Sequence, residues 1–123
     1  DAEVRDRRRA ILTADLPALR AAAPVHGARL LPFDDPFTKL DKDLLVADPA
    51  RRLKSVPASG HSPGYIPGAM LLDGEVIGGW QRQGRKVTLH PFGPVPARGR
   101  DALEREALAM PIAGPGTASV GWE

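Results

Sequence analysis

The sequence lacks cysteine and has few aromatic residues. Cysteine is absent from all 123 residues, which excludes disulfides and fits a reducing compartment. Aromatic residues are only 5% of the chain, so its core must be aliphatic and modest in size. No apolar run approaches the roughly 18 residues of a membrane span, and no signal-peptide pattern begins the chain. These absences favour a cytoplasmic protein with no membrane partner.

Net charge is also nearly absent. Lys and Arg number 17 against 15 Asp and Glu, and a net charge of +2 does not by itself indicate nucleic acid. The basic residues nevertheless gather in clusters, which are Arg5, Arg7, Arg8 and Arg9; Arg51, Arg52 and Lys54; Arg82, Arg85 and Lys86; and Arg98 and Arg100. Most are arginine, which binds phosphate with two hydrogen bonds. A GC-rich genome explains the same arginine content equally well.

The three histidines, His26, His61 and His90, are too scattered to give the ligand spacing of a zinc site. We therefore expect no metal and no cofactor. The sequence has no pattern that indicates an oligomeric state.

Glycine and proline are abundant, with 13 of each, which favours short elements joined by tight turns over a helical bundle. Periodicity alone leaves Arg9–Ala14 open between strand and helix. The other expected elements are a short helix that Asp15 caps and Pro24 ends, a strand over Gly27–Phe33, a loop over Val56–Gly68, a helix over Asp101–Met110 and a final strand over Thr117–Trp122.

The clearest pattern is a hairpin. Ala69–Leu72 and Glu75–Arg82 flank Asp73-Gly74, a dipeptide that favours the type I′ turn. After Gln83-Gly84-Arg85, the alternating segment Lys86–Phe92 adds a third antiparallel strand. Gly78-Gly79 predicts a bend or bulge there, as at a barrel corner. We predict an α+β fold with a small, curled, antiparallel, barrel-like sheet and two short helices.

Four segments carry a family resemblance. They are Leu31 to Asp34, the Asp-Gly hairpin from Asp73 to Trp80, the charged helix from Arg100 to Met110, and the closing Trp122-Glu123. In order and spacing they resemble the C-terminal part of the bacterial winged-helix DNA-binding proteins, a family that includes crosslink-unhooking glycosylases of the azinomycin-resistance type. The segment ILTADLPALRA is similar to the family's strand-then-helix lead-in, which favours a strand over Arg9–Ala14.

The resemblance, and a chain that begins at Asp1, imply a single domain over residues 1–123 that is the C-terminal fragment of a longer winged-helix protein. It also implies that the chain is non-catalytic by itself. Glycosylases of the family carry a Gln-aliphatic-Gln or His-aliphatic-Gln motif in their upstream winged helices. Gln81-Arg82-Gln83 has that spacing, but its middle residue is charged, and we interpret the match as coincidence.

Other chemical candidates have simpler structural explanations. The acidic residues Asp34, Asp35, Asp41 and Asp43 fit a solvated loop with Asx turns better than an acid–base or metal site. Ser59, His61 and Ser62 lack the strained strand-to-helix turn of a nucleophile. Trp80 could stack on a base, but its alternation with Val76 favours the core, beside Leu31, Leu72, Val87 or Leu103.

The candidate DNA-binding residues are Arg82, Arg85, Lys86, Arg51 and Arg52. The first three flank a tight turn, so their side chains should converge at a hairpin tip on one side of the molecule and follow phosphates. A charged tip that keeps a sheet edge soluble is an equally good explanation. The expected partner is double-stranded DNA, bound through the full-length protein. The alternative is a packing or interaction module of a winged-helix transcription regulator without enzymatic activity.

Overall fold

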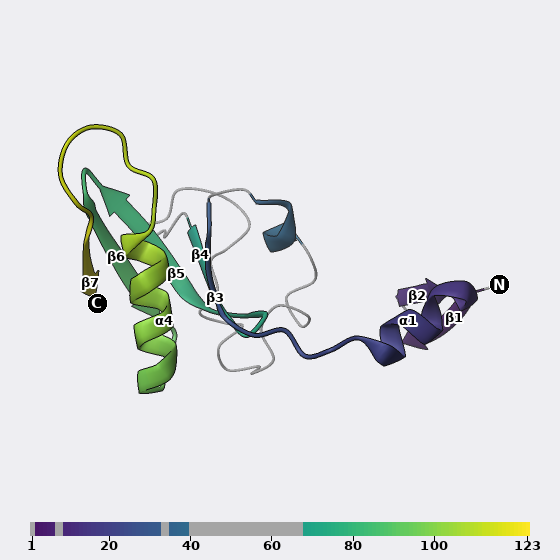
Figure 1. Ribbon diagram of the computed structural model, residues 1–123. Coiled ribbons are helices and arrows are strands. Elements are labelled where there is room, and N and C mark those ends of the chain that lie inside the picture. The colour runs from purple at the N-terminus through teal and green to yellow at the C-terminus, as the bar shows by residue number, and fades with distance from the viewer. Residues whose placement is uncertain (1, 7–8, 33–34, 40–67) are drawn as a thin grey trace.

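The structure is a computed structural model that describes residues 2–6, 9–32, 35–39 and 68–123. With η for a 3₁₀ helix, its elements are β1 (Ala2–Asp6), β2 (Arg9–Leu12), η1 (Thr13–Asp15), α1 (Leu16–Ala21), β3 (Ala28–Leu31), η2 (Pro36–Lys39), β4 (Gly68–Leu72), β5 (Glu75–Gln83), β6 (Lys86–Pro91), α4 (Ala97–Leu108) and β7 (Ser119–Trp122). Figure 1 shows two groups, the β1–β2 hairpin with α1, and a five-stranded sheet with α4 against it.

The N-terminal group begins with an antiparallel hairpin in which Ala2 lies opposite Leu12. The second strand confirms the strand expected from Arg9. It ends at Leu12 because residues 13–15 already turn into a 3₁₀ helix. Asp15 precedes α1 as predicted, but its side chain makes no capping hydrogen bond. The reason is that its backbone is helical, with φ −88° and ψ −12°, whereas a capping residue adopts an extended conformation.

The predicted meander is confirmed. β3, β4, β5 and β6 pair in sequence, each antiparallel to the next. At the turn between β4 and β5, Asp73 has φ 51° and Gly74 has φ 82°. Positive φ at both central residues defines the type I′ turn, whose twist matches that of the flanking strands.

β5 contains the expected bulge. Met70 lies opposite Gly78 and Leu71 opposite Val76, so Ile77 is the extra residue. A Cβ at Gly78 would collide with the carbonyl oxygen of His90 and the methyl group of Met70. Glycine therefore lets the bulged strand approach both of its neighbours closely.

The α+β class is confirmed, but two details of the predicted sheet are corrected. The sheet is mixed, because β7 pairs in parallel with β6, placing Val120 opposite Val87 and Trp122 opposite Leu89. It is also open, with β3 at one edge and β7 at the other, so barrel-like is only a loose description. The connection through α4 explains the parallel pair, because a crossover helix returns the chain to the end from which β6 started.

α4 begins one turn before the predicted Asp101. Gly99 in this first turn is buried, and a Cβ there would lie 2.6 Å from Cδ2 of Leu72. The glycine thus permits close contact between the helix and β4. The predicted apolar face is confirmed, since Leu103 and Ala107 are fully buried against the sheet.

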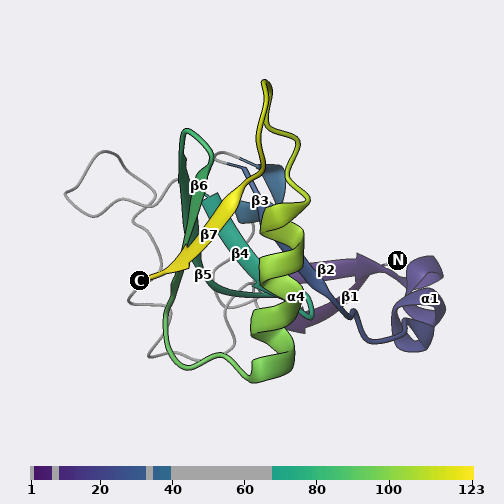
Figure 2. The same ribbon diagram turned by 60° about the vertical axis from the view of Figure 1, so that its left-hand side comes forward.

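The core lies mainly between α4 and one face of the sheet, and both views of the ribbon show α4 lying against that face (Figures 1 and 2). Met70, Val87, Leu89 and Leu103 are its largest fully buried side chains. A second, smaller cluster is centred on Leu71 and Val76 and includes Leu31, Phe37, Ala69 and Phe92. The predominance of aliphatic side chains agrees with the low aromatic content.

Trp80 packs against the main core as predicted, but it is half-buried where deep burial was expected. The shared face with Val76 was wrong, because the bulge at Ile77 reverses the alternation and places Val76 in the second cluster. Its Nε1 donates a hydrogen bond of 2.8 Å to the carbonyl oxygen of Leu31. The ring fills the space beside Gly68, where a Cβ would collide with it. Trp80 therefore joins the end of β3 to β5 and does not stand free in solvent.

Trp122 fastens the parallel edge strand to α4. Its Nε1 donates a hydrogen bond of 2.7 Å to Oε1 of Glu104. On the ring face, the guanidinium carbon of Arg100 lies 4.1 Å from the ring centroid, within the range of a cation–π contact. The closing Trp-Glu of the sequence thus has a structural role.

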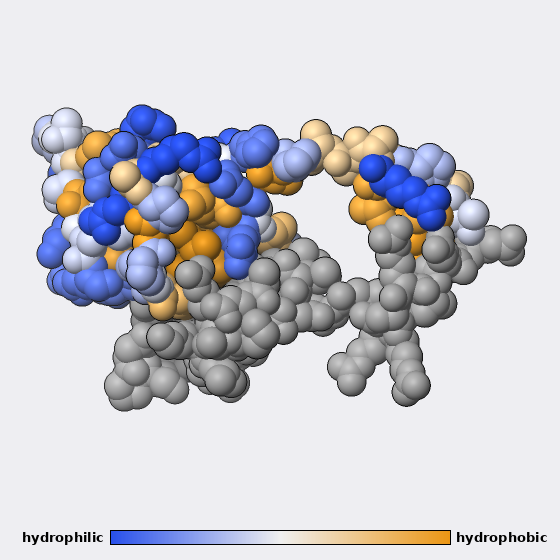
Figure 3. Space-filling view, turned by 90° about the horizontal axis from the view of Figure 1, so that it is seen from below, coloured by the Kyte–Doolittle hydropathy of each residue, from blue (hydrophilic) through white to orange (hydrophobic). Residues whose placement is uncertain are grey.

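The N-terminal group leaves apolar side chains uncovered by the described residues. Leu12 is 62% exposed and Leu19 47%, and Val25, in the segment between α1 and β3, is 65% exposed. Figure 3 shows orange, hydrophobic surface on this group and paler orange along the segment that joins it to the sheet. Leu16 alone among the residues of α1 is buried. Among the described residues, no helix has the length and apolarity to cross a membrane.

Candidate nucleic-acid interface

The end of the hairpin between β5 and β6 carries three of the predicted DNA-binding residues. A two-residue turn, Gly84-Arg85, joins the strands, and Gln83 pairs with Lys86. Gly84 has φ 59°, and a glycine with positive φ at the first central position is typical of the type II′ hairpin turn. The turn brings Arg82, Arg85 and Lys86 to one tip, and we call these three residues the tip cations.

The strand register separates two of the tip cations. Arg82 lies opposite Val87, which is buried on the α4 side of the sheet, so Arg82 belongs to that face. Lys86 lies opposite Gln83 and alternates with Val87, so it belongs to the other face. Both side chains are exposed. The structure thus brings the residues to one tip but presents them on its two faces, and not on one side as expected.

The guanidinium groups at the tip differ in their partners. Nη1 of Arg82 donates a hydrogen bond of 2.7 Å to the carbonyl oxygen of Gly84, within its own exposed turn. Arg85 is half-buried, and it reaches the loop between α4 and β7, where Nη1 donates to the oxygen of Gly116 at 2.9 Å and Nη2 to that of Ala113 at 2.8 Å. Sequence reasoning missed this loop, because a pairing across some thirty residues has no local pattern.

Electrostatics favour an anion at the tip. Residues 80–90 contain the tip cations and no Asp or Glu, and residues 107–119 contain no ionisable side chain. These two described segments therefore bring positive charge, and no carboxylate of their own, to a phosphate approaching this end of the sheet. The other two candidates, Arg51 and Arg52, lie outside the described residues.

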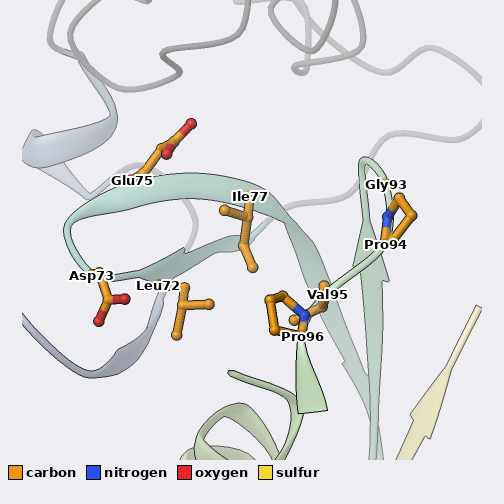
Figure 4. Close-up of a pocket in the computed structure, with 8 residues that line it drawn as sticks. All are labelled: Leu72, Asp73, Glu75, Ile77, Gly93, Pro94, Val95 and Pro96. Carbon is orange, nitrogen blue, oxygen red and sulfur yellow. The ribbon is translucent and has the colours of Figure 1, made fainter. Parts of the chain in front are cut away.

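A cleft of about 340 Å³ lies at the other end of β5 (Figure 4). Its lining is largely apolar and consists of Leu72, Asp73, Glu75, Ile77, Gly93, Pro94, Val95 and Pro96. In Figure 4 Leu72, Ile77, Val95 and Pro96 lie around the hollow, while Glu75 points away from it. Its ionisable side chains are the carboxylates of Asp73 and Glu75, and its lining contains no histidine and no hydroxyl group.

Asp73, at the rim of the cleft, has a structural role. Its Oδ1 accepts a hydrogen bond of 2.9 Å from the backbone N–H of Gly27, and its Oδ2 lies 3.3 Å from Nη2 of Arg98. The hydrogen bond from Gly27, together with the charges of Arg98 and His26, lowers the pKa of Asp73 below its ordinary value. The side chain therefore remains ionised near neutral pH and joins the start of β3 to the hairpin turn.

The other residues considered for catalysis or metal binding lie as follows. Asp35 makes an Asx turn, in which its Oδ1 accepts a hydrogen bond of 2.9 Å from the N–H of Phe37. Gln81 and Gln83 are exposed near the end of β5. Outside the described residues lie Asp34, Asp41, Asp43, Ser59, His61 and Ser62. In the described ranges, no group of three or more His, Asp or Glu side chains converges as metal ligands would.

Comparison with known proteins gives two matches. A family model described as DNA glycosylase AlkZ-like matches residues 1–111. Among solved structures, the chain is similar to the Streptomyces sahachiroi DNA glycosylase AlkZ, with 27% sequence identity and a TM-score of 0.56. That similarity covers 82% of this chain but only 28% of AlkZ. A comparison with curated proteins found no match.

Proposed function

The chain belongs to the AlkZ-like family of DNA glycosylases, and we propose that it is the DNA-contacting, non-catalytic C-terminal part of a longer repair enzyme. In this proposal the catalytic glutamine or histidine motif lies in winged helices that precede the chain. Two observations support it. The similarity covers only 28% of AlkZ, and Asp73 at the rim of the cleft is held by the N–H of Gly27 and by Arg98. A cytoplasmic location, where bacterial DNA lies, is part of the same proposal.

The observation that carries the DNA contact is the hairpin tip. It presents Arg82 and Lys86 in solvent, with Arg85 between them and no acidic residue from 80 to 90. Phosphate contacts of this kind position a protein on double-stranded DNA without reading its sequence. We include Arg51 and Arg52 in the proposed surface, since phosphate neutralisation needs several cations in one patch.

The test removes the exposed charges from the full-length protein. Arg82→Gln combined with Lys86→Gln should weaken binding to any duplex, because each lost phosphate contact removes one source of counterion release. The plot of log affinity against log salt should flatten by roughly one unit of slope for each lost contact. Fluorescence anisotropy over a salt series measures both quantities.

Arg98→Gln is the matched control. Arg98 is also an exposed arginine, but it lies by the Asp73-Gly74 turn, at the opposite end of β5 from the tip. Its removal should leave the salt slope unchanged. Unchanged affinity and slope in the tip variant would mean that this chain serves only as scaffold.

A further inference from the structure

The tip is formed by two chain segments. Besides the two side-chain hydrogen bonds from Arg85, the backbone N–H of Ser119 donates to the carbonyl oxygen of Arg85 at 2.9 Å. These three bonds hold the loop of residues 111–118 against the β5–β6 turn. Figures 1 and 2 show the loop and the turn reaching toward the same end of the sheet.

The loop is shaped around the guanidinium of Arg85. Gly114 and Gly116 have φ of 90° and 100°, a region that residues with a side chain rarely adopt. A Cβ at Gly114 would lie 3.2 Å from Nη2 of Arg85, and a Cβ at Gly116 would lie 3.3 Å from its Nε. Glycine thus serves both the turn and the close approach.

Arg85 therefore differs from the other tip cations. Two of its guanidinium nitrogens are engaged by carbonyl oxygens of the loop, and its side chain is half-buried. Arg82 and Lys86 are exposed on the two faces of the hairpin. The loop beside them is exposed from Ala113 to Thr117, carries no acidic side chain and has a backbone N–H at each of these residues except Pro115.

We propose that Arg85 is a positioning residue, which holds the Ala113–Gly116 loop beside the β5–β6 turn so that the loop forms a second part of the phosphate-contacting surface. The inference rests on the proposed function. Backbone N–H groups are common phosphate ligands in protein–DNA complexes, and a loop held in place loses less entropy on binding. The charge of Arg85 adds to the local potential, while its hydrogen bonds remain within the protein.

The test compares Arg85→Lys with Arg85→Gln in the full-length protein. Lysine keeps the charge but cannot make the two-pronged contact with the loop. We expect amide hydrogen exchange at residues 113–118 of the free protein to accelerate on the order of fivefold for each hydrogen bond lost. DNA affinity should fall several-fold in Arg85→Lys with an unchanged salt slope. Gly116→Ala, which removes no charge, should have the same effect.

Two outcomes would overturn the inference. The first is wild-type affinity and loop exchange in Arg85→Lys and Gly116→Ala, with a lower salt slope only in Arg85→Gln, which would make Arg85 itself a phosphate ligand. The second is faster loop exchange without any change in DNA affinity, which would make the loop purely structural. Failure of the proposed function is distinguishable from both, because Arg82→Gln and Lys86→Gln would then also leave DNA binding unchanged.

Discussion

Trp80 and Arg85 are long side chains at the same end of the sheet, and both direct polar atoms to backbone carbonyls. Nε1 of Trp80 donates to Leu31, and the guanidinium of Arg85 donates to Ala113 and Gly116. Each bond joins elements that are far apart in sequence. A side chain that the sequence offered as a candidate for nucleic-acid binding therefore also stabilises the fold.

Trp80→Ala should destabilise the chain by about 3 kcal/mol, because it removes packing against the core and leaves a cavity beside Gly68. Trp80→Phe keeps an aromatic ring but loses the hydrogen bond to Leu31 and part of the indole packing, so it should cost less, at about 1–2 kcal/mol. Urea unfolding followed by circular dichroism gives both values. Equal losses in the two variants would show that the hydrogen bond, and not packing, dominates.

At the scale of the element, the β4–β5 hairpin combines turn chemistry with a tertiary contact. Asp73-Gly74 sets the type I′ turn, while the Asp73 carboxylate binds the N–H of Gly27 and lies beside Arg98. The same residue thus fixes the hairpin and anchors the chain just before β3. The sequence predicted the first role only, because the second depends on a segment 46 residues away.

The lowered pKa of Asp73 predicts a pH dependence of stability. A carboxyl group whose pKa is lower in the folded state stabilises the protein above its unfolded pKa of about 3.9, and this contribution disappears as the pH falls through the folded pKa. Asp73→Asn keeps the turn, since Asn-Gly also favours type I′. The variant should therefore be less stable than the wild type at pH 7, and the difference should vanish at low pH.

Urea unfolding of both proteins at a series of pH values from 7 down to about 2.5 measures this difference across the relevant range. Arg98→Gln is the companion variant, and it should remove only the part of the effect that Arg98 contributes. A stability difference that stays constant over the whole range would contradict the assignment to the charge of Asp73.

The direction of the edge strand β7 is a second feature that the sequence did not predict. A strand, a helix and another strand follow one another from Lys86 to Trp122, an order typical of a parallel crossover. The preceding antiparallel meander led us to expect that the last strand would also be antiparallel. The helix was predicted, but its role as a crossover between two parallel strands was not. The direction of β7 is decided by the path of α4 across the sheet.

At the scale of the whole molecule, exposed apolar side chains are unevenly distributed over the described residues. The sheet and α4 enclose their own core and leave Leu108 exposed at the end of α4. Leu12 and Leu19 are exposed on the N-terminal hairpin and helix, and Val25 is exposed on the segment that follows them. The proposed DNA contact lies at one end of the sheet, far along β5 from the cleft beside Asp73. This distribution supports a part that contacts DNA and packs against the remainder of a larger enzyme.

Base release provides the test at this scale. The isolated chain should release no base from alkylated or crosslinked duplex DNA, because the proposed catalytic motif lies outside it, whereas the full-length protein should release the damaged base. Product analysis by chromatography measures both. Activity in the isolated chain would refute its non-catalytic role. A full-length protein that binds DNA but removes no base would instead support a transcription regulator.

The sequence by itself determined the local elements of this protein. Asp73-Gly74, the alternation after Lys86 and the apolar face of Leu103 and Ala107 each depend on neighbours in the chain, so their patterns are visible without a structure. The order of four short segments also sufficed to indicate the family. The strand β1 was not predicted, because its segment is short and charged and is not followed by a glycine that would indicate a hairpin.

Only the tertiary structure decided what depends on distant segments meeting. The parallel direction of β7, the close contact of Gly99 with Leu72 and the attachment of Arg85 to the Ala113–Gly116 loop each require a partner that lies far away in sequence. The tertiary structure likewise placed Arg82 and Lys86 on opposite faces of the hairpin. They belong to neighbouring pairs in the register, and neighbouring pairs point to opposite faces of a sheet. Local propensity carries no information about such pairings, since they are stabilised only when the whole sheet has formed.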